Sequence, residues 1–166
     1  MDTYLAIASK RDERAYADTP VPADVERRIL DCARLSGSSR NTQQWEFVVV
    51  SGDAQQRLAD AVYAPDNVRT AALVVAIVGE ARPFDVGRCV QNMMVGAWND
   101  GVVSCPNGIR EPERAAEICG GDVKAIVSLG YPVRPRNPER RGADEWWSAR
   151  ANRKPLDELI RRVEEG

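Results

Sequence analysis

The chain has 166 residues, a hydrophobic fraction of 43% and a formal net charge of −2. A chain of this length can bury roughly 70% of its unfolded surface in one core, so we expect a single domain over residues 1–166. The small net charge gives no general reason to expect nucleic acid or an anionic membrane as a partner.

The sequence contains no histidine, which excludes Ser-His-Asp and Cys-His nucleophile pairs and histidine metal sites. Its four cysteines form no C-x-x-C pair and none of the zinc spacings, so we expect no metal site and free thiols. The apolar segment near the N-terminus is too short for a signal peptide, and nowhere do 18 apolar residues run together. We therefore expect a cytoplasmic protein that uses carboxylates, thiols, backbone groups or a bound cofactor.

The first half of the chain alternates between helical and strand patterns. Residues 2–9 and 20–36 are predicted helices, and the second carries apolar residues at helical spacing. Residues 45–52 are a predicted buried strand, and residues 53–63 return to a helix. Residues 71–79 form a second apolar strand, which we expect at the centre of a sheet covered by helices because it is apolar on both faces.

The second half continues the alternation. Residues 84–101 give the strongest helical pattern, with a wide apolar face that includes Met93, Met94 and Trp98. A short strand over 102–105, a helix over 111–121 and a last core strand over 123–132 follow. Alternating strands and helices predict a three-layer α/β or α+β domain.

The C-terminal part differs in composition. Residues 132–142 hold three prolines and four arginines, typical of an extended segment. The Trp146-Trp147 pair is too apolar for a free tail, and a last helix is predicted to carry one apolar face made by Leu156, Leu159, Ile160 and Val163. Residues 133–166 either wrap around a partner subunit as an arm or fold back on their own domain. Composition leaves both interpretations open.

Three polar segments are candidates for binding. In “KRDERAY”, three cations stand within five residues, which suits either a solvated turn or a seat for a phosphate. “SGSSRNTQQW” gathers short hydroxyl and amide side chains, as a polar loop or a cradle for a flat polar ligand does. In “CPNGI”, Pro-Asn-Gly predicts a turn after a strand, with backbone N–H groups left free to point outward.

Taken in order, these pieces resemble the nitroreductase family of flavin enzymes. The pieces are “KRDERAY…PVP”, “GSSRNTQQWEFVVV”, “FDVGRCVQNMMVGAW…GVVSC”, “VSLGYP” and “RKPLDELI”. The resemblance runs from about Ala6 to Ile160. It implies an α+β fold, a three-layer α/β/α sandwich around a central, mostly antiparallel sheet. It also implies an intertwined homodimer with two identical FMN sites at the interface, in which the C-terminal segment of one subunit completes the sheet of the other.

The resemblance further implies a set of FMN-binding residues. The family's N-terminal signature, which contacts flavin and phosphate, falls on Lys10, Asp12 and Arg14, with Arg11 between them. The family's flavin-facing loop, contributed by the partner subunit, is matched by Ser38, Ser39, Asn41, Gln43 and Trp45. The backbone that meets the flavin N5 position falls near Pro106, Asn107 and Gly108. Asn67 is implied at the pyrimidine edge, and Arg153 at the phosphate.

The implied activity is an FMN-dependent NAD(P)H oxidoreductase. Hydride passes through the flavin by a ping-pong mechanism to a small-molecule acceptor such as a nitroaromatic or a quinone, and no side chain is expected to be catalytic. Three departures from the family pattern stand out. Asp12 replaces a serine, Gln44 replaces a proline, and only “GEARPF” separates the second core strand from the long helix, so we expect no lid over the pocket.

Two alternatives accompany this interpretation. One is a non-enzymatic or flavin-poor dimer of the same fold, because the Asp12 carboxylate weakens phosphate binding unless Arg11 or Arg14 pairs with it. The other is a flavin destructase that makes 5,6-dimethylbenzimidazole, which the chain resembles in the first motif.

Overall fold

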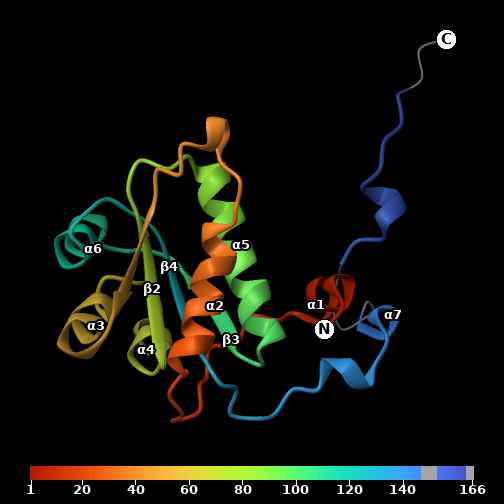
Figure 1. Ribbon diagram of the computed structural model, residues 1–166, viewed down its shortest axis with the longest axis horizontal. Coiled ribbons are helices and arrows are strands. Elements are labelled where there is room, and N and C mark those ends of the chain that lie inside the picture. Colours follow the sequence, from red (N-terminus) through yellow and green to blue (C-terminus); the bar gives the residue numbers. More distant parts are fainter. Residues whose placement is uncertain (147–152, 164–166) are drawn as a thin grey trace. The chain divides into compact units, whose positions relative to one another are not determined.

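The computed structural model describes residues 1–146 and 153–163 (Figure 1). The chain divides into two compact units. Residues 10–136 form the larger unit, and residues 1–9 together with the described residues from Asn137 onward form the smaller one. The single domain expected over residues 1–166 stays a prediction.

A four-stranded sheet organises the larger unit. Its strands are β1 (Glu46–Val50), β2 (Leu73–Val78), β3 (Val103–Asn107) and β4 (Val123–Gly130), in the order β1-β2-β4-β3. Each neighbouring pair is antiparallel. All six residues of β2 are buried and the strand lies between β1 and β4, which confirms the central position predicted for residues 71–79.

Helices cover both faces of the sheet. Figure 1 shows α2 (Ala23–Arg34) and α5 (Pro83–Asn99) side by side over one face, with α3 (Gly52–Ala59), α4 (Pro65–Arg69) and α6 (Pro112–Cys119) on the other. The main core lies between α2, α5 and the sheet, and includes Ile29, Val75, Ile77, Met93 and Leu129. The predicted α+β sandwich of three layers is confirmed, and its sheet is antiparallel throughout.

Two predicted elements have different bounds in the structure. The helix predicted over 53–63 ends at Ala59, and a separate short helix, α4, begins at Pro65. The strand predicted over 102–105 continues to Asn107, so Pro106 and Asn107 pair with β4 and do not form a turn. Proline is tolerated there because β3 is an edge strand, whose outward N–H groups need no ladder partner.

The smaller unit contains α1 (Thr3–Ser9), α7 (Ala143–Trp146) and 3-10 turns over Pro138–Arg140 and Leu156–Glu158. The Trp146 indole N–H donates to the Pro138 carbonyl at 3.2 Å, and the Arg141 guanidinium lies 5.5 Å from the Trp146 ring centroid. Trp146 is therefore anchored as its size suggests, whereas Trp147 lies outside the described residues.

The prediction of a final helix is wrong for the described residues. Between residues 153 and 163, the only helical element is the 3-10 turn Leu156–Glu158. The four residues of the expected apolar face, Leu156, Leu159, Ile160 and Val163, are 46–74% exposed. An isolated amphipathic helix of this length is marginal without a surface to pack against.

Within the described residues, no helix is long and apolar enough to cross a membrane. The same part of the chain holds no group of three or more Cys, Asp or Glu side chains arranged for a metal ion. All four cysteines are free thiols.

Candidate functional site

The cationic segment Lys10–Arg14 lies along the free edge of β3. Asp12 forms a parallel bridge with Ser104, and the Glu13 N–H donates to the Ser104 carbonyl at 3.1 Å. An edge strand offers unpaired backbone groups, and this segment uses them. Two of the predicted flavin-binding groups, the N-terminal signature and the end of β3, are therefore brought together by backbone pairing.

The charges of this segment are partly compensated. Lys10 forms an ion pair with Asp12, and its ammonium nitrogen lies 3.5 Å from the Met94 sulfur on α5. The Arg11 guanidinium donates to the Lys10 carbonyl at 2.8 Å. The Asp12 carboxylate is thus paired with Lys10. Arg14 is exposed, and it forms no ion pair with the part of the chain that the structure describes.

A buried polar cluster lies under the end of β3, on the face covered by α4. Asn107, Asn67 and Ser128 are all less than 10% exposed. The Asn67 amide donates to the Asn107 side-chain oxygen at 3.1 Å, and the Asn107 amide donates to the Ser128 hydroxyl at 3.0 Å. The Asn67 amide is therefore hydrogen-bonded within the protein, to Asn107 of the segment predicted to meet the flavin N5 position.

Gly108 follows directly after β3 and touches an exposed aromatic ring. A Cβ at Gly108 would lie 3.0 Å from a ring carbon of Tyr63, whose side chain is 72% exposed. The Tyr63 N–H donates to the Gly108 carbonyl at 3.0 Å, and the Arg110 N–H donates to the Ala61 carbonyl at 2.8 Å. The loop after β3 is thus tied to residues 61–63.

Tyr16 connects the cationic segment to the same buried cluster. Its hydroxyl oxygen lies 2.8 Å from the Ser128 hydroxyl oxygen and 3.0 Å from the Glu13 carbonyl oxygen. Burial raises the pKa of Tyr16 above its ordinary value, reinforced by the nearby Cys105 and Asp12, whereas Ser128 and Arg14 lower it. A buried neutral phenol is therefore part of the native structure.

The buried Tyr16 phenol should make the free energy of unfolding depend on pH in the alkaline range. Above about pH 10 the unfolded chain releases the Tyr16 proton and the folded chain keeps it, so the free energy of unfolding falls as pH rises, by up to about 1.4 kcal/mol per pH unit. Tyr16→Phe removes this contribution. Urea unfolding of both proteins at about pH 9 and about pH 11 measures the difference.

Three cysteine thiols also lower the stability of both proteins at alkaline pH. Burial also raises the pKa values of Cys32, Cys89 and Cys119, so both proteins lose stability at alkaline pH through them. The wild type should lose more than Tyr16→Phe. Equal losses in the two proteins would contradict the assignment of the Tyr16 proton.

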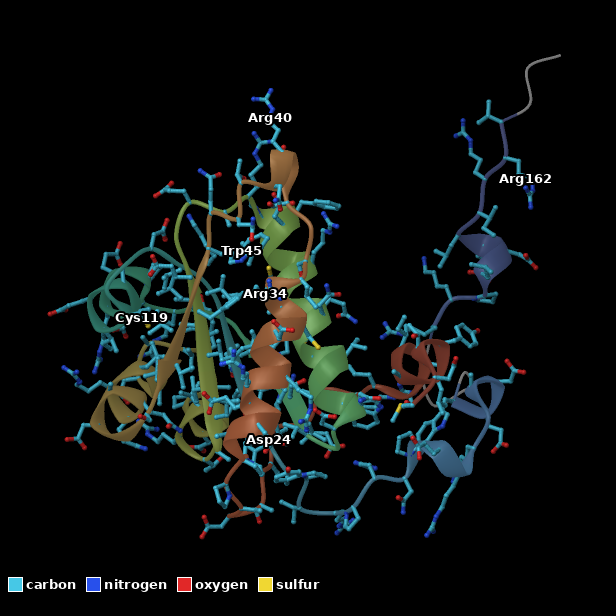
Figure 2. All side chains as sticks on the ribbon, in the orientation of Figure 1. Asp24, Arg34, Arg40, Trp45, Cys119 and Arg162 are labelled. Atoms are coloured by element: carbon cyan, nitrogen blue, oxygen red, sulfur yellow. The ribbon has the colours of Figure 1, made fainter. Side chains whose placement is uncertain are left out.

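The predicted flavin-facing loop presents its side chains to solvent. Ser39, Asn41 and Gln43 are exposed, and Figure 2 shows Arg40 pointing away from the rest of the unit. Arg40, Asn41 and Gln43 have φ of 53°, 56° and 48°, a conformation that costs of order 1–3 kcal/mol at each such residue. The Gln43 N–H donates to the Ser38 hydroxyl at 3.0 Å and holds this geometry.

The base of this loop is fixed by the first turn of α5. Asp85 is only 6% exposed and accepts from the Ser39 N–H at 3.3 Å. A Cβ at Gly37 would lie 2.5 Å from the Arg88 guanidinium, so the glycine permits a close approach to α5. Trp45, at the other end of the loop, packs against the main core. A rigid base with an exposed tip suits a loop that contacts another molecule.

The loop and the cationic segment contact different ends of α5. Ser39 contacts Asp85 in the first turn, and Lys10 contacts Met94, nine residues further along the helix. At 1.5 Å per residue, the two α5 residues are about 14 Å apart along the helix axis. One chain therefore does not bring all the predicted residues into one place. Arg153 is exposed in the smaller unit, and its contact with the phosphate stays a prediction.

Sequence reasoning did not identify three residues of these groups: Tyr16, Asp85 and Ser104. Tyr16 and Asp85 act through hydrogen bonds to Ser128 and Ser39, which are distant in sequence, and nothing in their spacing signals them. Ser104 has a buried hydroxyl with no hydrogen-bond partner among the described residues. Its register partner Leu129 belongs to the core beneath α2 and α5, which places Ser104 on that face of β3.

A cavity of about 560 Å³ lies elsewhere in the larger unit. It is lined by Tyr16, Ala17, Asp18, Thr19, Pro20, Arg69, Thr70, Ala71 and Ala72. None of the predicted FMN-binding residues lines it. The predicted donors lie instead along the edge of β3 and on the exposed loop.

The donor set at the edge of β3 fits a flavin mononucleotide. Arg14 is an exposed cation suited to a phosphate. On β3, the Ser104 hydroxyl has no hydrogen-bond partner within residues 1–146 and 153–163. Lys10 is less available, because Asp12 already neutralises it. The residues present fit the cofactor, and arginine is the cation available for its phosphate.

Comparison with known proteins shows a resemblance to one family. The model of the nitroreductase family matches residues 7–81. A protein of Archaeoglobus fulgidus, named for NADH dehydrogenase or NAD(P)H nitroreductase activity, is 25% identical over 167 residues, which cover 84% of this chain and 96% of that protein. Over residues 7–81, the resemblance to the nitroreductase family is thus confirmed.

Other relatives match a shorter segment. A 4-nitrobenzoate reductase of Pseudomonas putida is 40% identical over 58 residues, which cover 35% of this chain and 26% of the reductase. A chloronitrobenzene nitroreductase of Comamonas testosteroni is 38% identical over 55 residues, 33% of this chain and 24% of that enzyme. The chain thus matches about a quarter of the length of these nitroreductases.

Solved structures share the fold. A nitroreductase-like protein of Desulfovibrio desulfuricans, crystallised with FMN, superposes with a TM-score of 0.79 at 20% identity, over 100% of this chain and 99% of that chain. A nitroreductase family protein of Clostridium difficile gives the same TM-score and identity, over 99% of this chain and 100% of that chain. At this identity the likeness concerns the fold alone.

Proposed function

We propose that the protein is an FMN-dependent NAD(P)H oxidoreductase that reduces nitroaromatic or quinone-like acceptors. The observation that carries the proposal is the pairing of the Lys10–Arg14 segment with β3 at Ser104, in a segment that carries an exposed arginine. The family resemblance and relatives named as nitroreductases support it. FMN, when bound, supplies the hydride and electron chemistry, which explains why a chain without histidine needs no general base of its own.

The side chains of the protein bind and orient the cofactor. Arg14 and Arg153 neutralise the phosphate, and each charge-assisted hydrogen bond contributes roughly 1.5–3 kcal/mol. The backbone at Pro106–Gly108 meets the flavin ring edge. Two arginines fall short of the roughly 8–12 kcal/mol of micromolar to nanomolar binding, so burial of the ring must supply the rest.

A homodimer provides that burial. The exposed loop at Ser38–Gln43 and the cationic segment contact α5 about 14 Å apart, so a loop from a second copy is needed to complete each site. The exposed apolar residues Leu156, Leu159, Ile160 and Val163 suit an interface with the second copy. In the proposed dimer, the C-terminal segment, with residues 133–166 as an arm, completes the partner's sheet. A cytoplasmic location stays a prediction.

Steady-state kinetics test the activity. The FMN-loaded protein should oxidise NADH or NADPH only when an acceptor is present, with 4-nitrobenzoate and a benzoquinone as probes. If hydride donor and acceptor use the same face in turn, initial rates at several fixed acceptor concentrations give parallel double-reciprocal lines. A flavin-loaded protein that oxidises neither nucleotide would contradict the proposed reaction.

A further inference from the structure

The buried cluster under β3 joins the segments that the proposed FMN site needs. Asn107 stands at the end of β3, Asn67 on α4, Ser128 on β4, and Tyr16 follows the cationic segment. These four side chains are at most 9% exposed, although each carries a polar group. Polar groups this deep destabilise a fold unless their hydrogen bonds are made.

The hydrogen bonds of the cluster form one consistent set. The Asn107 oxygen accepts from Asn67 at 3.1 Å, and the Asn107 amide donates to Ser128 at 3.0 Å and to the Cys105 carbonyl at 3.1 Å. The Ser128 hydroxyl donates to the Cys105 carbonyl at 3.2 Å, and Tyr16 closes the chain of contacts at 2.8 Å from Ser128. The Asn107 carboxamide therefore uses its oxygen and both its amide hydrogens inside the protein.

We propose that Asn67, Asn107, Ser128 and Tyr16 form an internal brace that positions the end of β3 and the loop after it. The brace rests on the proposed function in one respect: the loop it positions, at Gly108, is the one assigned to the flavin ring edge. In this arrangement Asn67 is a positioning residue that acts through Asn107, and it does not itself contact FMN. Tyr16 links the same brace to the segment that carries Arg14.

A matched pair of variants tests the brace. Asn107→Leu removes a buried carboxamide that ties β3 to α4 and β4. Gln55→Met removes another buried carboxamide in the same layer, which donates to the Val68 and Ala71 carbonyls at 2.8 and 2.9 Å instead of to β3. Both variants should lose stability to urea, because each removes hydrogen bonds from buried polar groups.

Amide hydrogen exchange in the flavin-free protein is the first readout. The Tyr63 and Arg110 amides hold the loop after β3 to residues 61–63. In Asn107→Leu they should exchange roughly tenfold faster relative to the amides of β2, as expected when local opening becomes easier. In Gln55→Met that ratio should stay at the wild-type value. Equal ratios in Asn107→Leu and Gln55→Met would overturn the brace.

FMN binding is the second readout. Asn107→Leu should raise the FMN dissociation constant about tenfold and shift the visible absorption of the bound flavin, whereas Gln55→Met should do neither. Asn67→Leu distinguishes a positioning role of Asn67 from direct contact with FMN. It also replaces Asn107→Leu as the test if that variant does not fold. A brace predicts faster loop exchange together with weaker FMN binding, while weaker FMN binding with unchanged exchange would mean direct contact and overturn the proposal.

The two proposals fail separately. If the wild-type protein takes up no FMN, the proposed function fails, and the exchange of Tyr63 and Arg110 still decides whether the brace exists. If FMN binds and the exchange ratios do not change in Asn107→Leu, the brace fails and the oxidoreductase remains.

Discussion

Replacing both Arg14 and Arg153 with alanine should raise the FMN dissociation constant by at least about 100-fold, since each charge-assisted hydrogen bond contributes roughly 1.5–3 kcal/mol. Arg14 is exposed and not engaged in an ion pair within the described residues, so its loss leaves no buried charge behind. Arg153 is exposed as well. Isothermal titration of each variant with FMN measures the effect, and urea unfolding checks that the fold persists.

The control for this pair carries the same change of charge. Arg57→Ala with Arg161→Ala removes one exposed arginine from each unit at positions outside the proposed site. Its FMN affinity should stay within about twofold of the wild type, because screened surface charges contribute little at a distance. If the control and the Arg14/Arg153 pair weaken FMN equally, general electrostatic attraction explains the binding and the phosphate assignment is wrong.

Gly79→Ala should destabilise the larger unit by about 2–4 kcal/mol. Gly79 has φ of 119°, which side chains other than glycine rarely adopt, and its Cβ would lie 2.8 Å from the Gln44 carbonyl oxygen. Neither the strain nor the backbone contact can be relieved by turning a side chain. Because Gln44 ends the flavin-facing loop, the substitution should also weaken FMN binding. Urea unfolding gives the first effect and FMN titration the second.

Gly87→Ala is the comparison for that substitution. Gly87 lies in α5, and a Cβ added there meets no heavy atom within 4 Å. Alanine should stabilise the helix by about 0.5–1 kcal/mol, because glycine loses more conformational freedom there. A Gly79→Ala protein as stable as the wild type would show that the β2–α5 connection does not constrain the loop.

Much of the fold follows from the apolar pattern. Residues 71–79 are apolar at nearly every position and are found as a central strand with both faces covered, and the wide apolar face of residues 84–101 packs against α2 and the sheet. The last predicted helix fails for the opposite reason. Leu159 and Ile160 have helical spacing but no packed surface within the described chain, and spacing alone does not stabilise a helix.

The candidate site could be predicted only in part. The resemblance indicated the residue types and their order, and the structure brings Asp12 beside Ser104 at the edge of β3. The partner of Asp12 is Lys10. The buried position of Asn67 was not foreseeable, because it depends on contact with Asn107, which is distant in sequence. The left-handed backbone at Arg40 and Gln43 was likewise invisible, since neither residue type signals a positive φ.

Equilibrium titration of the flavin-free protein with FMN, combined with sedimentation of the same samples, tests the central claim most directly. The account predicts saturable binding of one FMN per chain in a dimer, with a dissociation constant of about 1 μM or tighter and a yellow product that bleaches with NADH or NADPH. A colourless protein that takes up no FMN at concentrations near about 1 mM, or one that binds FMN as a monomer, would contradict it.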